Sequence, residues 1–265
     1  MHLTVLESGI WQTTTTVVAA GGAVVVIDPA YFPRELAEVA AVARAAGRVE
    51  AVVFTHGHWD HVMGYAALPE APVWMHAGLD RAIAAADPRA AAYLADARAF
   101  DARWYVPRPG GHRWPTTRRG LVDDQRLAVG DLTLRVLHLP GHSPDGLGLV
   151  ADELLVVGDH LSPCEIPFVD DLPAYCATLR RLRAELAGDV RTVVPGHGPV
   201  LSAAAADAIA AADLAYLDQL ATVAAAGDVA AAVAMALPRA ADVVGMRDHH
   251  RDNCVKLGLA MPPST

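Results

Sequence analysis

The sequence has few cysteines and no excess of basic charge. Its three cysteines, Cys164, Cys176 and Cys254, are too few and too far apart to build a disulfide framework, so we expect reduced thiols. The formal net charge of −9 argues against a general affinity for nucleic acid or for an anionic membrane, because both would need a basic surface. We therefore expect neither nucleic acid nor a membrane among its partners.

Long uninterrupted hydrophobic segments are also missing. The longest uncharged stretch, residues 8–27, contains Gln12, four consecutive threonines and the pair Gly21-Gly22, which favour two strands and a turn over a membrane span. The first residues, MHLTVLES, have no basic segment followed by a uniform apolar one, so they do not resemble an export signal. We expect a cytoplasmic protein.

The sequence does contain enough apolar residues for a substantial core. Hydrophobic residues make up 53% of the 265 residues and charged residues 19%, which excludes intrinsic disorder. Strands and helices alternate, which predicts a single α/β domain over residues 1–265 with an alanine-rich helical extension at about 202–265. The predicted strands span residues 14–20, 23–28, 50–55, 73–76, 121–128, 131–139, 147–151, 154–158 and 191–194. The predicted helices span residues 34–46, 79–103 and 172–187, and residues 104–120 form an irregular loop.

Three histidines and an aspartate lie within six residues directly after the predicted strand 50–55, in the sequence HGHWDH. Neutral imidazole and carboxylate are preferred ligands of borderline metals such as Zn²⁺. His56 and His58 can point the same way and share one ion, whereas Asp60 and His61 point towards a neighbouring position. The motif therefore predicts two metal ions.

Two ions need further ligands, and three candidates each lie at a strand end beside glycine. They are His142 in LPGHSPDG, Asp159 in VVGDHL and His197 in VVPGHGP. Glycine lets the backbone turn sharply and approach an ion closely. A single histidine in a loop is more often solvent-facing than a metal ligand, but that interpretation does not account for all seven residues together.

The order HGHWDH, GHS, GD and GHG resembles that of the metallo-β-lactamase-fold hydrolases, in particular their glyoxalase II-like branch, over about residues 10–200. The resemblance implies an α/β fold, an αββα sandwich of two mixed β-sheets flanked by helices. The zinc ligands that it implies are His56, His58 and His142 for one ion, Asp60, His61 and His197 for the second, and Asp159 as a bridge. Asp28, which would orient a ligand imidazole, and Ser143 would lie just behind these ligands.

The same residues separate several activities known in this family. His58 in place of a glutamate speaks against a flavodiiron-type centre, and the presence of Asp159 speaks against a true β-lactamase. The acidic net charge disfavours the branches that cleave RNA or DNA. Persulfide dioxygenases share most of the ligands but use one iron ion. A mononuclear Fe²⁺ enzyme therefore stays open as an alternative, as does a non-catalytic metal-binding protein.

Hydrolysis is the chemistry that this ligand set favours. Two cations that share a water bring its pKa down from about 15.7 towards 7, and the bridging hydroxide attacks an acyl carbonyl. Asp60 would hold the hydroxide and accept its proton. No G-x-S-x-G motif for a nucleophilic serine occurs. We expect a small acyl substrate, free or carrier-bound, with a thioester first and an ester or lactone next.

Candidate substrate contacts come mainly from the loop between Trp104 and Arg119, whose rings could form an apolar wall and whose arginines could bind an acidic group. The candidates are Trp59, Tyr65, Trp104, Tyr105, His112, Trp114, Arg118 and His250, with Arg108, Arg113, Arg119, His249 and Asn253 as further ones. The alternative is a solvated loop whose aromatic residues pack down on the sheet. We interpret His76, His138 and His160 as structural. The alanine-rich helices after residue 202 favour ordinary core packing or a homodimer contact.

Overall fold

Two six-stranded β-sheets lie at the centre of the computed structural model, which describes residues 1–108, 110–239 and 245–262. The first sheet has the order β1-β2-β3-β4-β5-β6, with strands His2–Glu7, Thr14–Ala20, Ala23–Ile27, Arg48–Val53, Val73–His76 and Arg118–Leu121. The second has the order β12-β11-β10-β9-β8-β7; from β7 to β12 its strands are Arg126–Val129, Leu132–His138, Leu147–Ala151, Leu154–Val156, Thr192–Val194 and Leu201–Ser202. Both sheets are mixed, since β3–β4 and β10–β11 are parallel pairs among antiparallel ones.

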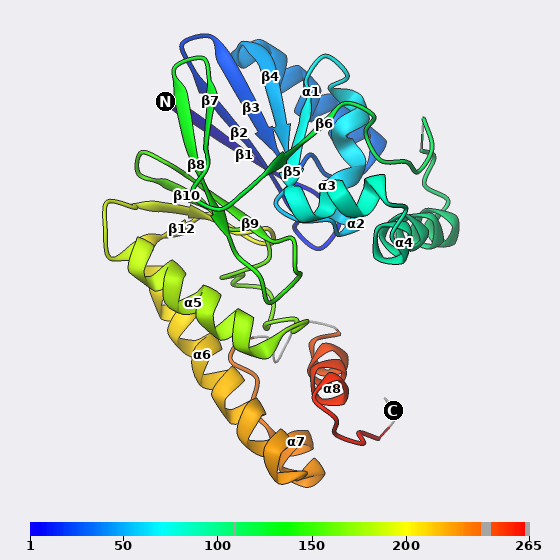
Figure 1. The fold of residues 1–265 in the computed structure, drawn as a ribbon, viewed down its shortest axis with the longest axis vertical. Coiled ribbons are helices and arrows are strands. Elements are labelled where there is room, and N and C mark those ends of the chain that lie inside the picture. The colour runs from blue at the N-terminus through cyan, green and yellow to red at the C-terminus, as the bar shows by residue number, and fades with distance from the viewer. Residues whose placement is uncertain (109, 240–244, 263–265) are drawn as a thin grey trace.

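Helices cover the outer faces of the two sheets (Figure 1). In the first half they are α1 (Pro33–Ala46), α2 (Trp59–Val62), the 3-10 helix η1 (Met63–Ala67), α3 (Ala77–Ala84) and α4 (Pro88–Trp104). In the second half they are α5 (Leu172–Leu186), α6 (Ala203–Ala226), α7 (Val229–Ala234) and α8 (Met246–Lys256). The predicted αββα sandwich is confirmed.

Strand β3 shows why its residues form a central strand. Val24 and Val26 belong to the apolar layer under α1, whereas Val25 and Ile27 belong to the layer between the two sheets. Side chains alternate between the faces of a strand, so a strand that is covered on both faces needs apolar residues at every position. The run AVVVI meets that need, and all five residues are buried.

One strand of the structure was not predicted, and two predicted elements differ from the structure. The edge strand β1 was not predicted, because its residues are only partly buried and its apolar pattern is weak. The predicted helix 79–103 is two helices, since Ala86 adopts a positive φ of 53° and Asp87 caps a new helix by accepting from the Arg89 N–H. The predicted strand 121–128 is also two strands. There the chain crosses from β6 in the first sheet to β7 in the second, through a turn in which Asp124 has φ 57°.

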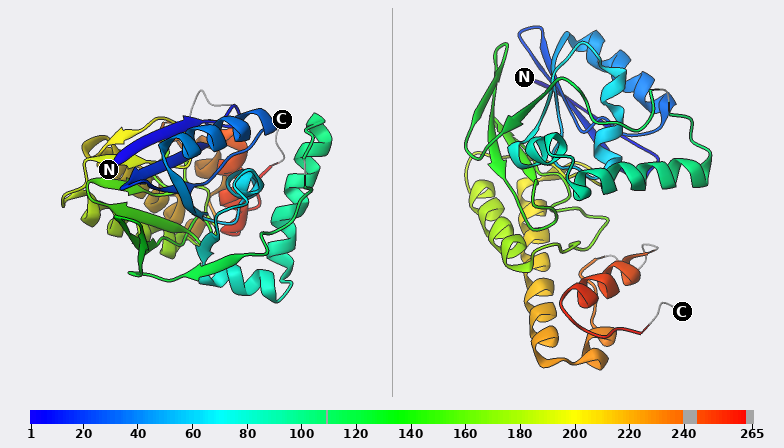
Figure 2. Two further views of the ribbon diagram at one scale, coloured as in Figure 1. Left: turned by 90° about the horizontal axis from the view of Figure 1, so that it is seen from above. Right: turned by 45° about the vertical axis from the view of Figure 1, so that its right-hand side comes forward.

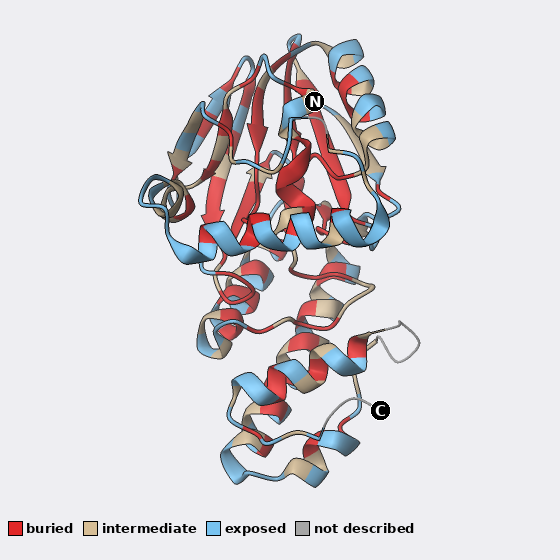
Figure 3. Ribbon diagram, turned by 90° about the vertical axis from the view of Figure 1, so that its right-hand side faces the viewer, coloured by how far each residue is buried: buried red, intermediate tan, exposed pale blue. Residues whose placement is uncertain are grey.

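The alanine-rich tail shares its core with the second sheet. Tyr216, Leu217 and Leu220 of α6 belong to the same apolar cluster as Leu137 and Leu155 of that sheet. Figure 2 shows α6 extending away from the sheets with α8 beside its far half, and Figure 3 shows buried residues along these helices. The single domain stays a prediction, and the predicted extension includes residues 240–244 and 263–265, which lie outside the described residues.

By length and composition, α6 is also apolar enough to cross a membrane, and 33% of its most apolar window is buried. The core helix of a soluble protein passes the same test, so this is weak evidence for a membrane span. The packing of α6 on α5 within the apolar cluster fits a core helix.

A buried carboxylate joins α4 to the loop that follows it. Asp101 accepts hydrogen bonds from Tyr31 Oη at 2.8 Å and Arg108 Nε at 2.7 Å, and its Oδ2 lies 2.7 Å from His112 Nε2. Burial raises the pKa of Asp101, but the hydrogen bonds from Arg108, Tyr31 and His112 more than offset this and hold the pKa below its usual value. The ionised carboxylate therefore fixes the start of the loop.

We expect Asp101→Ala to lower the free energy of unfolding by about 3–5 kcal/mol, because the change leaves the buried Arg108 guanidinium without its partner. Urea unfolding followed by circular dichroism measures this. Asp96→Ala, on the exposed face of the same helix, is the matched control and should change stability by less than about 0.5 kcal/mol. Equal effects of the two substitutions would contradict a structural role for Asp101.

Candidate metal centre

The seven predicted ligand residues meet at one edge of the two sheets. His56, His58, Asp60 and His61 follow β4, His142 follows β8, Asp159 follows β10 and His197 follows β11. Asp60 and His61 lie in the short helix α2, which turns the chain back over the strand ends. Residues separated by up to 141 positions are brought together because both sheets end at this edge.

His56, His58, His142 and Asp159 form the first group. His58 Nδ1 lies 3.0 Å from His56 Nε2 and 2.9 Å from His142 Nε2. Asp159 Oδ2 lies 3.3 Å from His56 Nε2 and 3.2 Å from His142 Nε2. Burial, and the neighbouring imidazoles of His56 and His142, lower the pKa of His58 well below its usual value, so this ring stays neutral. A neutral imidazole is the form that binds metal.

Asp60, His61 and His197 form the second group. His61 Nε2 lies 3.3 Å from Asp60 Oδ2 and 3.4 Å from His197 Nε2. The other oxygen of Asp159, Oδ1, lies 3.1 Å from His61 Nε2 and 3.4 Å from His197 Nε2. One oxygen of Asp159 therefore faces each group.

The carboxylates and imidazoles of the centre are buried together. Burial alone would raise the pKa of Asp60 and of Asp159, but His61 and His197 lower both below the usual range. Burial would lower the pKa of His197, but Asp159 and Glu165 raise it to about 10. Positive charge is thus strongly favoured between these groups, whether it is carried by protons or by a metal ion.

The donor set fits a borderline metal. Five imidazoles and two carboxylates suit zinc or iron better than magnesium or calcium, which prefer oxygen ligands alone. The side-chain ligand atoms of each group lie within 4.8 Å of one another.

Asp28 lies behind His61, where the sequence predicted an orienting acceptor. Its Oδ2 is 3.0 Å from His61 Nδ1, and its Oδ1 accepts from the Thr55 N–H at 2.7 Å. His197 is held in a similar way, since its Nδ1 donates to the backbone carbonyl of Trp11 at 3.0 Å. These acceptors turn the Nε2 atoms of both rings towards the centre.

Glycine is required where two backbone segments approach Asp159. A Cβ atom on Gly196 would lie only 2.2 Å from Asp159 Oδ1, and Gly158 adopts a positive φ of 55°. The glycines that flank the predicted ligands therefore make room for the centre, as the sequence pattern indicated.

A sequence model of the Metallo-beta-lactamase superfamily matches residues 8–197, which is more than half of the chain. The chain belongs to this superfamily. Hydroxyacylglutathione hydrolase of Xanthomonas euvesicatoria pv. vesicatoria is 30% identical over 65% of this chain and 57% of that protein. Atrochrysone carboxyl ACP thioesterase AgnL7 of Paecilomyces divaricatus is 36% identical over 32% of this chain and 26% of that protein. The chain thus spans between a quarter and somewhat more than half of these relatives.

Solved structures share the fold. A metallo-beta-lactamase family protein from Thermus thermophilus gives a TM-score of 0.67 at 18% identity and covers 96% of this chain and 91% of that one. ETHE1 from Myxococcus xanthus gives a TM-score of 0.58 at 20% identity and covers 81% and 85%, respectively. At these identities the similarity shows the fold alone.

Most of the predicted substrate contacts do not line the pocket that opens beside His58 and His142. Trp104 and Tyr105 are 59% and 92% exposed. Arg108 and His112 bind Asp101, and Arg118 pairs with Asp80. Trp114 Nε1 donates to the Ala90 carbonyl, and Tyr65 Oη donates to the Arg113 carbonyl. A substrate-binding role of the loop stays a prediction, and Pro109 lies outside the described residues.

Of two further candidates, Trp59 packs against the core and His250 is buried in it. Trp59 packs edge-on against Trp11 and Tyr31 and close to Phe100, with ring centroids 4.7–5.2 Å apart. His250 is buried, with Nδ1 2.9 Å from Tyr216 Oη and Nε2 2.9 Å from the Ala232 carbonyl oxygen.

The histidines that we interpreted as structural pack against other aromatic rings of the protein. His76 and His138 stack with ring centroids 4.4 Å apart across the two sheets. His160 is buried beside Tyr175, with centroids 4.8 Å apart.

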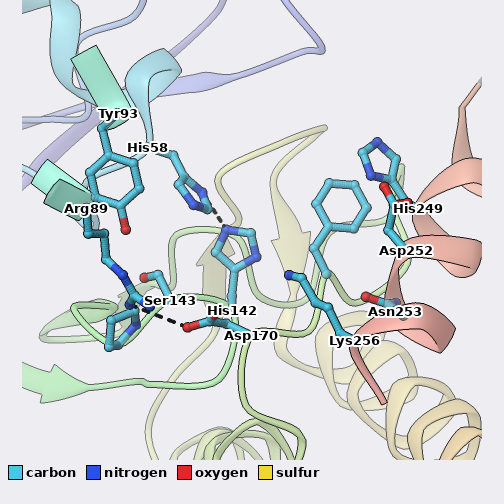
Figure 4. Close-up of a pocket in the computed structure, with 12 residues that line it drawn as sticks. His58, Arg89, Tyr93, His142, Ser143, Asp170, His249, Asp252, Asn253 and Lys256 are labelled. Carbon is cyan, nitrogen blue, oxygen red and sulfur yellow. Dashed lines mark hydrogen bonds and ion pairs between the residues drawn. The ribbon is translucent and has the colours of Figure 1, made fainter. Parts of the chain in front are cut away.

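A pocket opens directly beside His58 and His142 (Figure 4). Its other lining residues are Arg89, Tyr93, Ser143, Pro144, Phe168, Asp170, His249, Asp252, Asn253 and Lys256. Sequence reasoning included Ser143, His249 and Asn253 but missed the walls from α4 and from Phe168. Arg89 and Tyr93 are four residues apart, which puts both on one face of a helix. This spacing could have indicated that the two side chains line the same pocket wall.

We expect Asp28→Asn to weaken zinc binding about 10–100-fold. The amide keeps one acceptor for the Thr55 N–H, but its NH₂ group would then face His61 Nδ1, which also donates. Competition with a chromophoric chelator measures the affinity. Asp152→Asn, in the exposed turn between β9 and β10, is the matched control. Unchanged affinity in Asp28→Asn would remove Asp28 from this role.

Proposed function

We propose that this member of the superfamily is a dinuclear zinc hydrolase that cleaves a small acyl thioester, with an ester or a lactone as the next candidates. The observation that carries the proposal is the carboxylate of Asp159, which turns one oxygen towards each ligand group. A carboxylate in that position suits two cations lying side by side. Two relatives are named as a hydroxyacylglutathione hydrolase and an ACP thioesterase, which supports a thioester, free or carrier-bound.

Each residue of the candidate centre would have its own role in this reaction. His56, His58 and His142 would hold one zinc ion and Asp60, His61 and His197 the second, with one carboxylate oxygen of Asp159 facing each group. When bound, the two ions would supply a Lewis acid for the substrate carbonyl and make water acidic enough to react at neutral pH. Asp60, kept ionised by His61 and His197, accepts the proton of the attacking water. The Thr13 hydroxyl, 3.4 Å from Asp60 Oδ2, helps to hold this carboxylate in place. The acyl group reaches the centre through the pocket beside His58 and His142.

A mononuclear Fe²⁺ persulfide dioxygenase is the second candidate. The fold similarity to ETHE1 is compatible with it. The buried group of Asp60, His61 and His197 does not separate the two candidates, because persulfide dioxygenases share most of these ligands and use one ion. The homodimer and the cytoplasmic location stay predictions.

We expect Asp60→Asn to lower turnover of acyl thioesters by about 10²–10⁴-fold, because the amide cannot accept the proton. The substitution keeps the volume of the side chain, so the circular dichroism spectrum should stay unchanged. Asp207→Asn, at an exposed ion pair with Arg183, serves as the control and should keep full activity. A fully active Asp60→Asn enzyme would contradict the assigned role.

Metal analysis of the purified protein separates the two candidates. About two zinc ions per chain and hydrolysis of thioesters support the hydrolase. One iron ion per chain, with oxygen uptake on a persulfide and no thioesterase activity, would replace it with the dioxygenase. Bound zinc without turnover of thioesters, esters or lactones would indicate a non-catalytic binding protein.

A further inference from the structure

Lys256 is the only lysine in the sequence, and the other 20 basic residues are arginines. It ends α8 and lines the pocket beside the candidate metal centre. Its ammonium donates to the Val169 carbonyl oxygen at 2.9 Å. An ammonium has three N–H donors, so this contact fixes the side chain and still allows it to bind a ligand.

The wall that carries Lys256 is held rigidly. Asn253 accepts from the Val169 N–H at 2.9 Å and donates to the Pro167 carbonyl at 2.7 Å. His249 stacks on Phe168 with ring centroids 3.9 Å apart. Because α8 contacts the segment 167–169 through several residues, the position of Lys256 is set before any ligand binds.

Arg89 belongs to a different wall, in the first turn of α4. Its Nη1 lies 3.5 Å from Asp170 Oδ2, and both side chains are well exposed. A long, solvent-accessible ion pair is weak, so the guanidinium can exchange Asp170 for another anion. Figure 4 shows Arg89 and Lys256 on opposite sides of His142. Asp252 also lines the pocket, but its carboxylate lies 3.5 Å from Arg251.

We propose that Arg89 and Lys256 bind a carboxylate or phosphate group of the substrate while its thioester lies beside His58 and His142. The proposal rests on the thioesterase function proposed above. Guanidinium and ammonium groups form charge-assisted hydrogen bonds with oxyanions. In a chain of net charge −9, an anionic substrate is repelled overall and needs such local cations.

Three thioesters test the proposal and locate the anion. Butyryl-pantetheine is neutral, butyryl-4′-phosphopantetheine carries phosphate on the leaving thiol, and succinyl-pantetheine carries a carboxylate on the acyl group. We expect one anionic thioester to exceed the neutral one at least about tenfold in kcat/KM, as a charged hydrogen bond can provide. Lys256→Gln and Arg89→Gln should each reduce that preference about fivefold or more through KM, whereas Lys256→Arg should retain most of it.

Arg103→Gln is the matched control, because Arg103 lies at the far end of the same helix as Arg89, over the ring of Trp104. It should leave the preference unchanged. Equal kcat/KM values for all three thioesters would overturn the proposal and leave the thioesterase function standing. A preference that survives both glutamine variants would also overturn it.

A binding measurement keeps the test independent of turnover. Reductive methylation with ¹³C-formaldehyde labels one side chain, Lys256, together with the α-amino group. Phosphopantetheine or succinyl-pantetheine should shift the Lys256 signal, and pantetheine should not. If no thioester is hydrolysed, the proposed function fails, while a shift on adding the anion would still support the anion site. The absence of a shift with either anion would exclude the site.

Discussion

The carboxylate of Asp159 is the group on which the arrangement of the centre depends. It is buried, ionised and placed so that each oxygen faces two or more imidazoles. An isolated carboxylate in such surroundings would be strongly destabilising, so its position requires the positive charge that the surrounding rings or a metal supply. The positive φ of Gly158 and the missing side chain of Gly196 allow the backbone to deliver it there. One residue therefore faces both ligand groups.

Neither half of the chain can build this centre alone. The first sheet supplies His56, His58, Asp60 and His61, and the second supplies His142, Asp159 and His197. The two sets meet because an apolar layer, including Val25 of β3 and Val136 of β8, holds the sheets face to face. Packing of the sheets and assembly of the ligands are thus one event, which links the stability of the sandwich to metal binding.

The ligand residues could be predicted from the sequence because their signals are local. Each follows an apolar strand, and glycine beside His142, Asp159 and His197 marks the close approach of backbone. The contacts that the loop after α4 makes could not be predicted in this way. Whether Arg108 and His112 bind a substrate or a buried carboxylate depends on Asp101 and Tyr31, and the last of these is 77 residues away from Arg108. Such contacts appear only once the helices have packed.

The superfamily match covers the candidate metal ligands but not all of the pocket walls. The match ends at His197, so it contains every proposed ligand but none of α8. His249, Asn253 and Lys256 all belong to that helix, which reaches the pocket only because α6 carries the chain away from the sheets and the tail returns. The helix α8 thus supplies part of the pocket wall and none of the candidate ligands. We therefore expect α4, α8 and the segment around Phe168 to determine which substrate binds. The residues at the edge where the two sheets meet would carry out the reaction.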